Sequence, residues 1–212
     1  MDRIEKIYKK LEKLIVFEPI INKLARKNAT AFEILIATMM SSRTKDETTE
    51  KAAERLFNRF NTPQKLLKAK IKEIEKLIFP VGFYKTKAKN MIEISKLILN
   101  KYKGTVPHTQ EELISLPGVG LKTAALVLSE GFGIDEICVD THVHRISNRL
   151  GFVKTKTPEE TYYELKKKLP KKLWIKTNHY FVSYGKTICT PLRPKCSICK
   201  INDLCPKVGI LM

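Results

Sequence analysis

Four of the five cysteines in the sequence lie close together near its end and could bind one soft metal centre. They are Cys189, Cys196, Cys199 and Cys205, separated by six, two and five residues. A [4Fe–4S] cluster takes four thiolates, and its size tolerates loops of unequal length. Structural zinc usually uses two C-x2-C pairs, and only one such pair occurs here. The spacing favours an iron–sulfur cluster over zinc, with disulfides the least expected arrangement.

The charge of the chain favours a polyanionic partner. The 212 residues contain 40 Lys plus Arg against 22 Asp plus Glu, a formal net charge of +18. Such an excess attracts nucleic acid and speeds its capture. A Lys-rich solvated surface, as in thermophile proteins, would produce the same excess without a polyanionic partner. No apolar run reaches the roughly 20 residues that span a bilayer, so we expect no membrane segment. No secretory signal is expected either, because Met1-Asp2-Arg3 leads directly into an amphipathic pattern.

Helical periodicity runs through almost the whole chain and predicts an all-α protein of about ten helices. Apolar residues at helical spacing, up to Leu14 and Ile15, predict an amphipathic first helix, and the apolar residues 31–40 predict a buried central one. Helix starts and one helix end are marked by residues typical of caps: Thr62-Pro63, Thr109 with Glu112, Thr157-Pro158 with Glu160, and Gly151. Cys138, in an apolar stretch, is expected in the core.

Two glycines separated by one residue lie between two predicted helices in residues 109–131. A short helix ends at Pro117, Gly118-Val119-Gly120 turns the chain, and a second helix begins near Leu121. Glycines let backbone N–H groups approach a partner, and the next helix adds unpaired N–H groups and a positive dipole end. A plain turn between packed helices is the alternative. In so basic a chain, LPGVGLKTA favours a helix-hairpin-helix motif that holds a DNA backbone.

Lys122 is an unusual cation because it lies in the first turn of that second helix. The helix dipole disfavours an ammonium ion there, partial burial would disfavour it further, and a neutral amine is a nucleophile. Eighteen residues later, Asp140 begins another predicted helix. The intervening chain is long enough to bring the two helix starts together. Asp140 alone is most simply an N-cap, but beside Lys122 it favours a catalytic pair.

Together these features resemble the endonuclease III family of DNA glycosylase/AP lyases over nearly the full length. Besides the cysteine loop, the resemblance rests on residues 32–46 (FEILIATMMSSRTKD), 81–88 (VGFYKTKA), 116–124 (LPGVGLKTA) and 139–145 (VDTHVHR). It implies an all-α fold with two domains and a DNA-binding cleft between them. Residues 22–134 would form a six-helix barrel that contains the helix-hairpin-helix. Residues 1–21 and 135–212 would form an α-helical domain whose four clustered cysteines bind a [4Fe–4S] cluster.

The resemblance implies a bifunctional base-excision repair enzyme that removes oxidised pyrimidines and cleaves abasic sites. The damaged base is flipped out of the duplex, and the Lys122 amine attacks the sugar C1′. Asp140, as a carboxylate, assists deprotonation and stabilises positive charge on the sugar. A Schiff base and β-elimination then cut the strand. The expected partner is double-stranded DNA with a damaged base or an abasic site. We expect a monomer in the cytoplasm or nucleoid of a prokaryote, and the Lys/Ile-rich composition indicates a thermophile.

The same resemblance assigns further residues to DNA. Arg43 stands where the family usually has Gln, in the segment that fills the gap left by the flipped base. Phe83 is the matching apolar wedge, with an ordinary aromatic packed under a loop as a close alternative. His142 is expected to shape the active site, whereas His144 is given no role. The remaining residues expected at DNA are Gly118, Val119, Gly120, Arg193 and Lys195.

Other functions remain open at this point. A monofunctional mismatch (thymine or adenine) DNA glycosylase would share the fold, but related enzymes carry Tyr or Ser where this chain has Lys122. A non-enzymatic helix-hairpin-helix protein would bind abasic DNA and leave it intact. An electron carrier would use the cluster alone, which fits a basic helical chain poorly. The sequence does not specify the preferred lesion, the opposite base, a redox role or protein partners.

Overall fold

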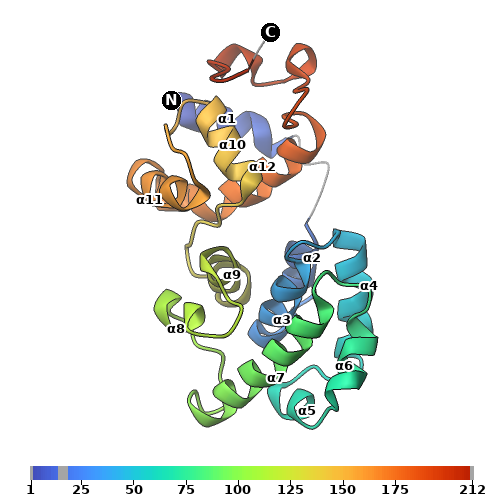
Figure 1. Cartoon of the computed structure of the whole chain (residues 1–212). Helices are drawn as coiled ribbons and strands as arrows, with labels where there is room; N and C mark the ends of the chain where they lie inside the picture. Colours follow the sequence, from blue (N-terminus) through green and yellow to red (C-terminus); the bar gives the residue numbers. More distant parts are fainter. Residues whose placement is uncertain (1, 14–18, 211–212) are drawn as a thin grey trace. The chain divides into compact units, whose positions relative to one another are not determined.

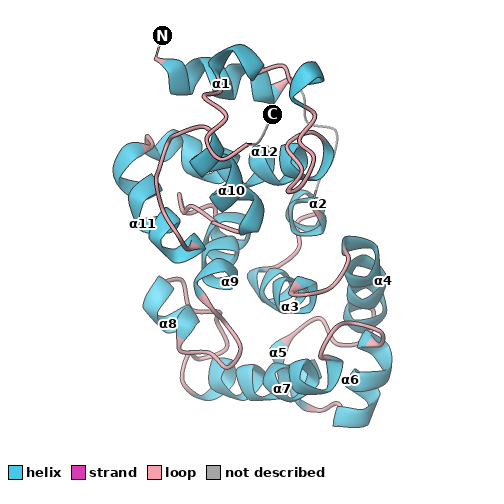
Figure 2. Cartoon of the chain, turned by 45° about the horizontal axis from the view of Figure 1, so that its top comes forward, coloured by secondary structure: helices cyan, strands magenta, loops and turns pink. Residues whose placement is uncertain are grey.

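Helices form all the regular structure in the part of the chain that the computed structural model describes, residues 2–13 and 19–210 (Figures 1 and 2). The predicted all-α fold is confirmed. Leu14 and Ile15, which the periodicity assigned to the first helix, lie outside the described residues. None of the described helices is long and apolar enough to cross a membrane. The chain separates into two compact units, Ile20–Ile134 and the combination of Met1–Pro19 with Asp135–Met212.

The unit Ile20–Ile134 is built around one buried helix. Its α-helices are α2 (Ile20–Arg26), α3 (Ala31–Ser41), α4 (Asp46–Phe57), α5 (Pro63–Leu67), α6 (Ile71–Ile78), α7 (Tyr84–Asn100), α8 (Gln110–Ile114) and α9 (Leu121–Leu126), the last continuing as a π-helix over Val127–Gly131. Helix α3 packs against α2, α4, α7 and α9. Ile34, Leu35 and Ile36 on it are fully buried. The predicted central helix is confirmed, because a helix apolar on all sides is stable only when surrounded.

Side-chain caps determine where several of these helices begin. Thr30 and Glu33 form a reciprocal capping box at the start of α3. Thr62 accepts a hydrogen bond from the N–H of Lys65, and Thr109 accepts one from the N–H of Glu112. Each cap satisfies a backbone N–H that has no partner within the helix. The predicted starts of α5 and α8 are therefore confirmed.

The second unit joins the first helix of the chain to its C-terminal third. Its α-helices are α1 (Arg3–Glu12), α10 (Thr141–Arg149), α11 (Pro158–Lys168) and α12 (Trp174–Thr187). Helix α12 packs against α1 and α10, as Figure 1 shows. Tyr8 on α1 lies within 2.6 Å of Thr177 on α12, both hydroxyls being buried. Contacts between segments so distant in sequence explain why α1 belongs to this unit.

Predictions about the second unit's local structure also hold. Thr157 caps α11 with Pro158 in its first turn. Gly151, directly after the C-cap of α10, has a φ of +65°, which favours glycine. Cys138 is 1% exposed and so lies in the core.

Candidate functional site

The hairpin between α8 and α9 uses its two glycines differently. Gly118 has a φ of +77°, and a Cβ there would lie 2.4 Å from Nδ2 of Asn90. Gly120 is the N-cap of α9, and a Cβ on it would meet nothing within 4 Å. The positive φ of Gly118 thus favours glycine in this turn, where any side chain would be strained. Gly120 instead leaves open space next to the backbone, where a partner could approach.

Val119, between the two glycines, is a core residue. Its side chain is only 5% exposed, and its N–H donates to the carbonyl of Leu116 over 3.1 Å. The Val119 side chain is therefore buried, and its N–H is already hydrogen-bonded within the hairpin. Val119 therefore packs within the hairpin, and its expected place at the DNA stays a prediction.

Lys122 is the second residue of α9, as predicted, but its side chain is exposed. The lysine remains distinctive because it follows the hairpin directly, at the helix end where positive charge is disfavoured. Lys122 is therefore an exposed residue at the start of the helix that follows the glycine hairpin.

Asp140 is the N-cap of α10 in the other unit. Its Oδ1 accepts hydrogen bonds from the N–H groups of His142, at 2.8 Å, and Val143, at 2.9 Å. The simple capping role that the sequence allowed is thus observed. These two bonds hold the half-buried carboxylate in one orientation at the helix start. Capping and a catalytic role are compatible, since capping fixes the position of the charged group.

The two histidines of α10 have different surroundings. Nδ1 of His142 lies 3.1 Å from a guanidinium nitrogen of Arg145, and a Cβ on Gly185 of α12 would come within 2.5 Å of that Nδ1. Arg145 in turn donates to the carbonyl of Cys189 at 2.9 Å. His142 on α10 therefore lies against α12, and Arg145 connects it to the start of the cysteine loop.

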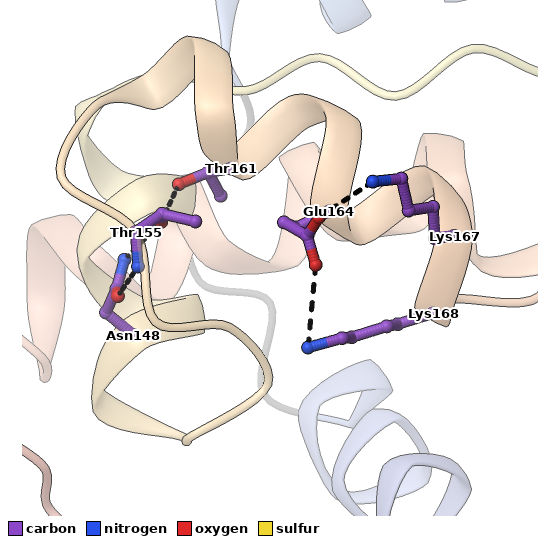
Figure 3. A network of polar contacts seen from close by, with 6 residues as sticks. All are labelled: Asn148, Thr155, Thr161, Glu164, Lys167 and Lys168. Carbon is purple, nitrogen blue, oxygen red and sulfur yellow. Dashed lines mark hydrogen bonds and ion pairs between the residues drawn. The ribbon is translucent and has the colours of Figure 1, made fainter.

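His144 belongs to a polar network that ties α10 to α11. Its Nδ1 lies 2.6 Å from the hydroxyl of Thr161, which is 2.5 Å from that of Thr155. Thr155 also bonds to Asn148. Figure 3 shows the contacts of Thr155 with Asn148 and Thr161, beside the ion pairs of Glu164. A packing role for His144 agrees with these bonds.

The four clustered cysteines line one cavity at the end of the chain. The pocket is lined by all four cysteines, by apolar side chains that include Ile146, Leu150, Ile188 and Ile201, and by Tyr184 and Arg149. None of the chain's five cysteines, all of them described, forms a disulfide. Among the described residues no three His, Cys, Asp or Glu side chains could hold a single metal ion. Four thiol side chains around one largely apolar pocket are the donor set that a [4Fe–4S] cluster takes.

Hydrogen bonds to the cysteine sulfurs support this fit. Arg149 Nη1 lies 3.3 Å from Sγ of Cys189, and the Tyr184 hydroxyl lies 3.0 Å from Sγ of Cys199. The backbone N–H of Lys207 donates to Sγ of Cys205 at 3.4 Å. Donors directed at thiolates and an apolar surround are the features by which proteins stabilise and tune iron–sulfur clusters.

The loop between the first two cysteines presents exposed cations. Arg193 and Lys195 are both exposed, beside Leu192, which is 93% exposed. A backbone hydrogen bond from Lys195 to Ile188, 2.9 Å long, anchors the loop base. The predicted phosphate-binding side chains therefore extend from a fixed loop into solvent.

The two predicted wedge residues lie together in the unit Ile20–Ile134. Arg43 has a φ of +52° and Phe83 a φ of +57°, both in the left-handed region. The Arg43 guanidinium carbon lies 5.6 Å from the centroid of the Phe83 ring, which is 63% exposed. An exposed aromatic in a conformation rare for such a residue indicates a functional position. The alternative of an ordinary ring packed under a loop does not fit this exposure.

Comparison with known proteins identifies the class. Residues 36–171 match the family model described as HhH-GPD superfamily base excision DNA repair protein. Residues 189–205 match the iron–sulfur binding domain of endonuclease III. The sequence is 50% identical over 179 residues to endonuclease III of Thermotoga maritima, covering 84% of each chain. The chain therefore belongs to the endonuclease III family of DNA glycosylase/AP lyases, whose cofactor is a [4Fe–4S] cluster.

Solved structures agree with this assignment. A non-covalent endonuclease III–DNA complex superimposes with a TM-score of 0.83 and 32% identity, covering 98% of this chain and 96% of the other. A trapped covalent endonuclease III–DNA intermediate has a TM-score of 0.80, also with 32% identity, over 98% and 97% of the two chains. At this coverage the fold extends through both units.

Sequence reasoning missed three residues of the site. Lys87 is buried beside Arg43, and Tyr184 and Arg149 bond to cysteine sulfurs. No short motif marks them, because each acts on a segment distant in sequence. The sequence places Arg149 near the end of the helix before Gly151, but it does not indicate that Arg149 contacts the sulfur of Cys189.

Proposed function

We propose that this protein is a bifunctional enzyme of base excision repair that removes oxidised pyrimidines from double-stranded DNA and cleaves abasic sites. One observation carries the proposal: an exposed lysine, Lys122, stands directly after the glycine hairpin in a member of the endonuclease III family. Hairpin N–H groups and the positive end of α9 would hold a phosphate close to this amine. A nucleotide bound there presents its sugar to the nucleophile.

The chemistry follows from two side chains. The Lys122 amine attacks the sugar C1′, and the base leaves with the electrons of the glycosidic bond. The Asp140 carboxylate accepts a proton and stabilises positive charge on the opening sugar. The resulting Schiff base acidifies the C2′ proton, whose loss expels the 3′ phosphate and cuts the strand. We propose that both side chains act on the same flipped-out nucleotide.

The remaining residues bind and orient DNA. Arg43 and Phe83 would fill the gap that the flipped nucleotide leaves, and Gly118 and Gly120 would admit the backbone. His142 would shape the active site at the start of α10, and Arg193 and Lys195 of the cysteine loop would contact phosphates. Cys189, Cys196, Cys199 and Cys205 would bind the cluster, which when present supplies the iron–thiolate cross-links that close this loop.

We also propose the arrangement and setting of the enzyme. Residues 22–134 would form the six-helix barrel, and residues 1–21 with 135–212 the cluster domain. The enzyme would act as a monomer in the cytoplasm or nucleoid of a prokaryote. The high Lys content and the relative from Thermotoga maritima support a thermophilic source. A melting midpoint in the mesophile range, about 45–65 °C, would contradict that last point.

Strand cleavage separates the candidate functions. Purified protein is incubated with end-labelled duplexes that contain thymine glycol, an abasic site, a G·T mismatch or an A·G mismatch. Cleavage of the first two without alkali is the result that we expect. Cleavage of a mismatch duplex only after alkali would identify a monofunctional glycosylase. Binding of the abasic duplex with no cleavage would identify a binding module.

A further inference from the structure

A buried lysine underlies the turns that carry the two wedge residues. Lys87 lies in the first turn of α7, and it is only 8% exposed. Its Nζ donates to the carbonyl of Ser42 at 2.6 Å and to that of Met40 at 2.9 Å, and it lies 3.5 Å from Oγ1 of Thr44. All three acceptors are uncharged oxygens of one short segment. The segment contains Arg43.

The contacts of Lys87 complete the end of α3. This helix ends at Ser41, so its last carbonyl groups have no N–H donors within the helix. The ammonium group supplies donors to that end and interacts favourably with the negative end of the helix dipole. Burying an ammonium ion is costly unless hydrogen bonds replace its water. A lysine held in this way fixes the backbone on both sides of Arg43.

A second contact joins the same segment to the turn before α7. The N–H of Gly82 donates to Oγ1 of Thr44 at 3.1 Å, and a Cβ on Gly82 would lie 2.6 Å from the carbonyl oxygen of Arg43. The two turns therefore approach so closely that only glycine fits. Phe83 follows this glycine directly, which explains why its ring lies against the Arg43 guanidinium.

We propose that Lys87 is a positioning residue that holds Arg43 and Phe83 together, so that both side chains enter the DNA duplex as one unit. The proposal rests on the function proposed above. Because the two wedges sit on separate turns, each could otherwise move without the other. Lys87 does not contact the substrate; it acts through the backbone of residues 40–44.

The test compares Lys87→Met with Lys89→Met, an exposed lysine on the same helix that loses the same charge. Cleavage is measured on duplex DNA with one abasic site and on the same strand alone. Wedges are needed only where a duplex must be opened. Lys87→Met is therefore expected to lower the duplex rate about tenfold or more, since small misplacements are costly. Its single-strand rate should match that of Lys89→Met.

Three further variants separate positioning from loss of folding. Lys87→Arg keeps charge and donors and should recover part of the duplex rate. Thr44→Val removes only the hydroxyl that Gly82 and Lys87 share, so it should lower the duplex rate even if Lys87→Met does not fold. In a Phe83→Ala background, adding Lys87→Met should cause little further loss, because the unit is already broken.

The outcomes distinguish the two proposals. A wild type that cleaves neither substrate contradicts the enzyme assignment itself. An active wild type contradicts the role of Lys87 if Lys87→Met behaves like Lys89→Met. An equal fall on duplex and single strand also contradicts it, because that shows general damage. Additive losses with Phe83→Ala would contradict it as well.

Discussion

The side chain of Asn90 on α7 lies against the backbone of Gly118. A Cβ atom on Gly118 would lie 2.4 Å from Nδ2 of Asn90. Gly118 also has a φ of +77°. Two residues later, Gly120 has neither restriction. The hairpin thus combines one glycine needed by the fold with another whose neighbouring space is open.

This difference predicts that one alanine variant loses stability and the other loses affinity for DNA. Gly118→Ala should lower the free energy of unfolding by about 1–3 kcal/mol through backbone strain and the clash. Gly120→Ala should change it by less than about 0.5 kcal/mol. If a phosphate approaches Gly120, the added methyl group should weaken duplex binding about tenfold or more, as loss of one charged hydrogen bond would. Urea unfolding and fluorescence anisotropy measure the two effects. Unchanged affinity in Gly120→Ala would exclude close approach there.

Two substitutions at Asp140 separate its capping role from its proposed chemical role. Asn caps helices as well as Asp does, so Asp140→Asn should keep the stability of α10, whereas Asp140→Ala should lose about 1 kcal/mol. Both remove the carboxylate, and both should slow base removal about 10²- to 10⁴-fold. Single-turnover rates on a thymine glycol duplex provide the measurement. A fully active Asp140→Asn would show that Asp140 is only an N-cap.

The hydroxyl of Tyr184, 3.0 Å from Sγ of Cys199, should stabilise the cluster. Donors to thiolate sulfur compensate its charge and help to set the reduction potential. Tyr184→Phe should lower that potential and hasten loss of iron to a chelator, followed by the decay of visible absorbance. Tyr163→Phe is the control, since Tyr163 is 52% exposed on α11. Equal rates of iron loss in the two variants would contradict a role for the Tyr184 hydroxyl.

Burial lowers the pKa of Lys87 to about 8 from its usual 10.5. Between pH 8 and pH 10.5 Lys87 carries a proton in the unfolded chain but not in the folded protein. The free energy of unfolding therefore increases as pH rises through this range. Below about pH 8 both states are charged and the gain is absent. The stability of wild type relative to Lys87→Met should therefore rise from pH 8 to pH 10.5. Urea unfolding of both proteins across this range tests the sign, and a constant difference would contradict it.

The features that the sequence predicted correctly are local or compositional. Residues 31–40 are too apolar to lie anywhere but in a core, and Thr62 and Thr109 cap the helices that follow them. The spacing of the cysteines similarly indicated a cluster loop before any fold was considered. In each case neighbouring residues carry the information, so no tertiary structure was needed.

The features that the sequence did not reveal depend on contacts between distant segments. Lys87 resembles every other lysine in the chain until Met40 and Ser42 are placed beside it. The left-handed backbone of Arg43 and Phe83 is uncommon for such residues, and it occurs in two turns that approach each other closely. The exposure of Lys122 also depends on distant segments, because a position at a helix start does not determine what covers it.

The most direct test of the central claim is borohydride trapping on a duplex with one abasic site. Reduction converts a Schiff base into a stable amine, so wild type should yield a covalent protein–DNA adduct. Lys122→Ala should yield none while retaining the cluster absorbance and duplex binding. An undiminished adduct in Lys122→Ala would mean that another amine is the nucleophile. No adduct from folded, cluster-containing wild type that binds the duplex would contradict the lyase mechanism.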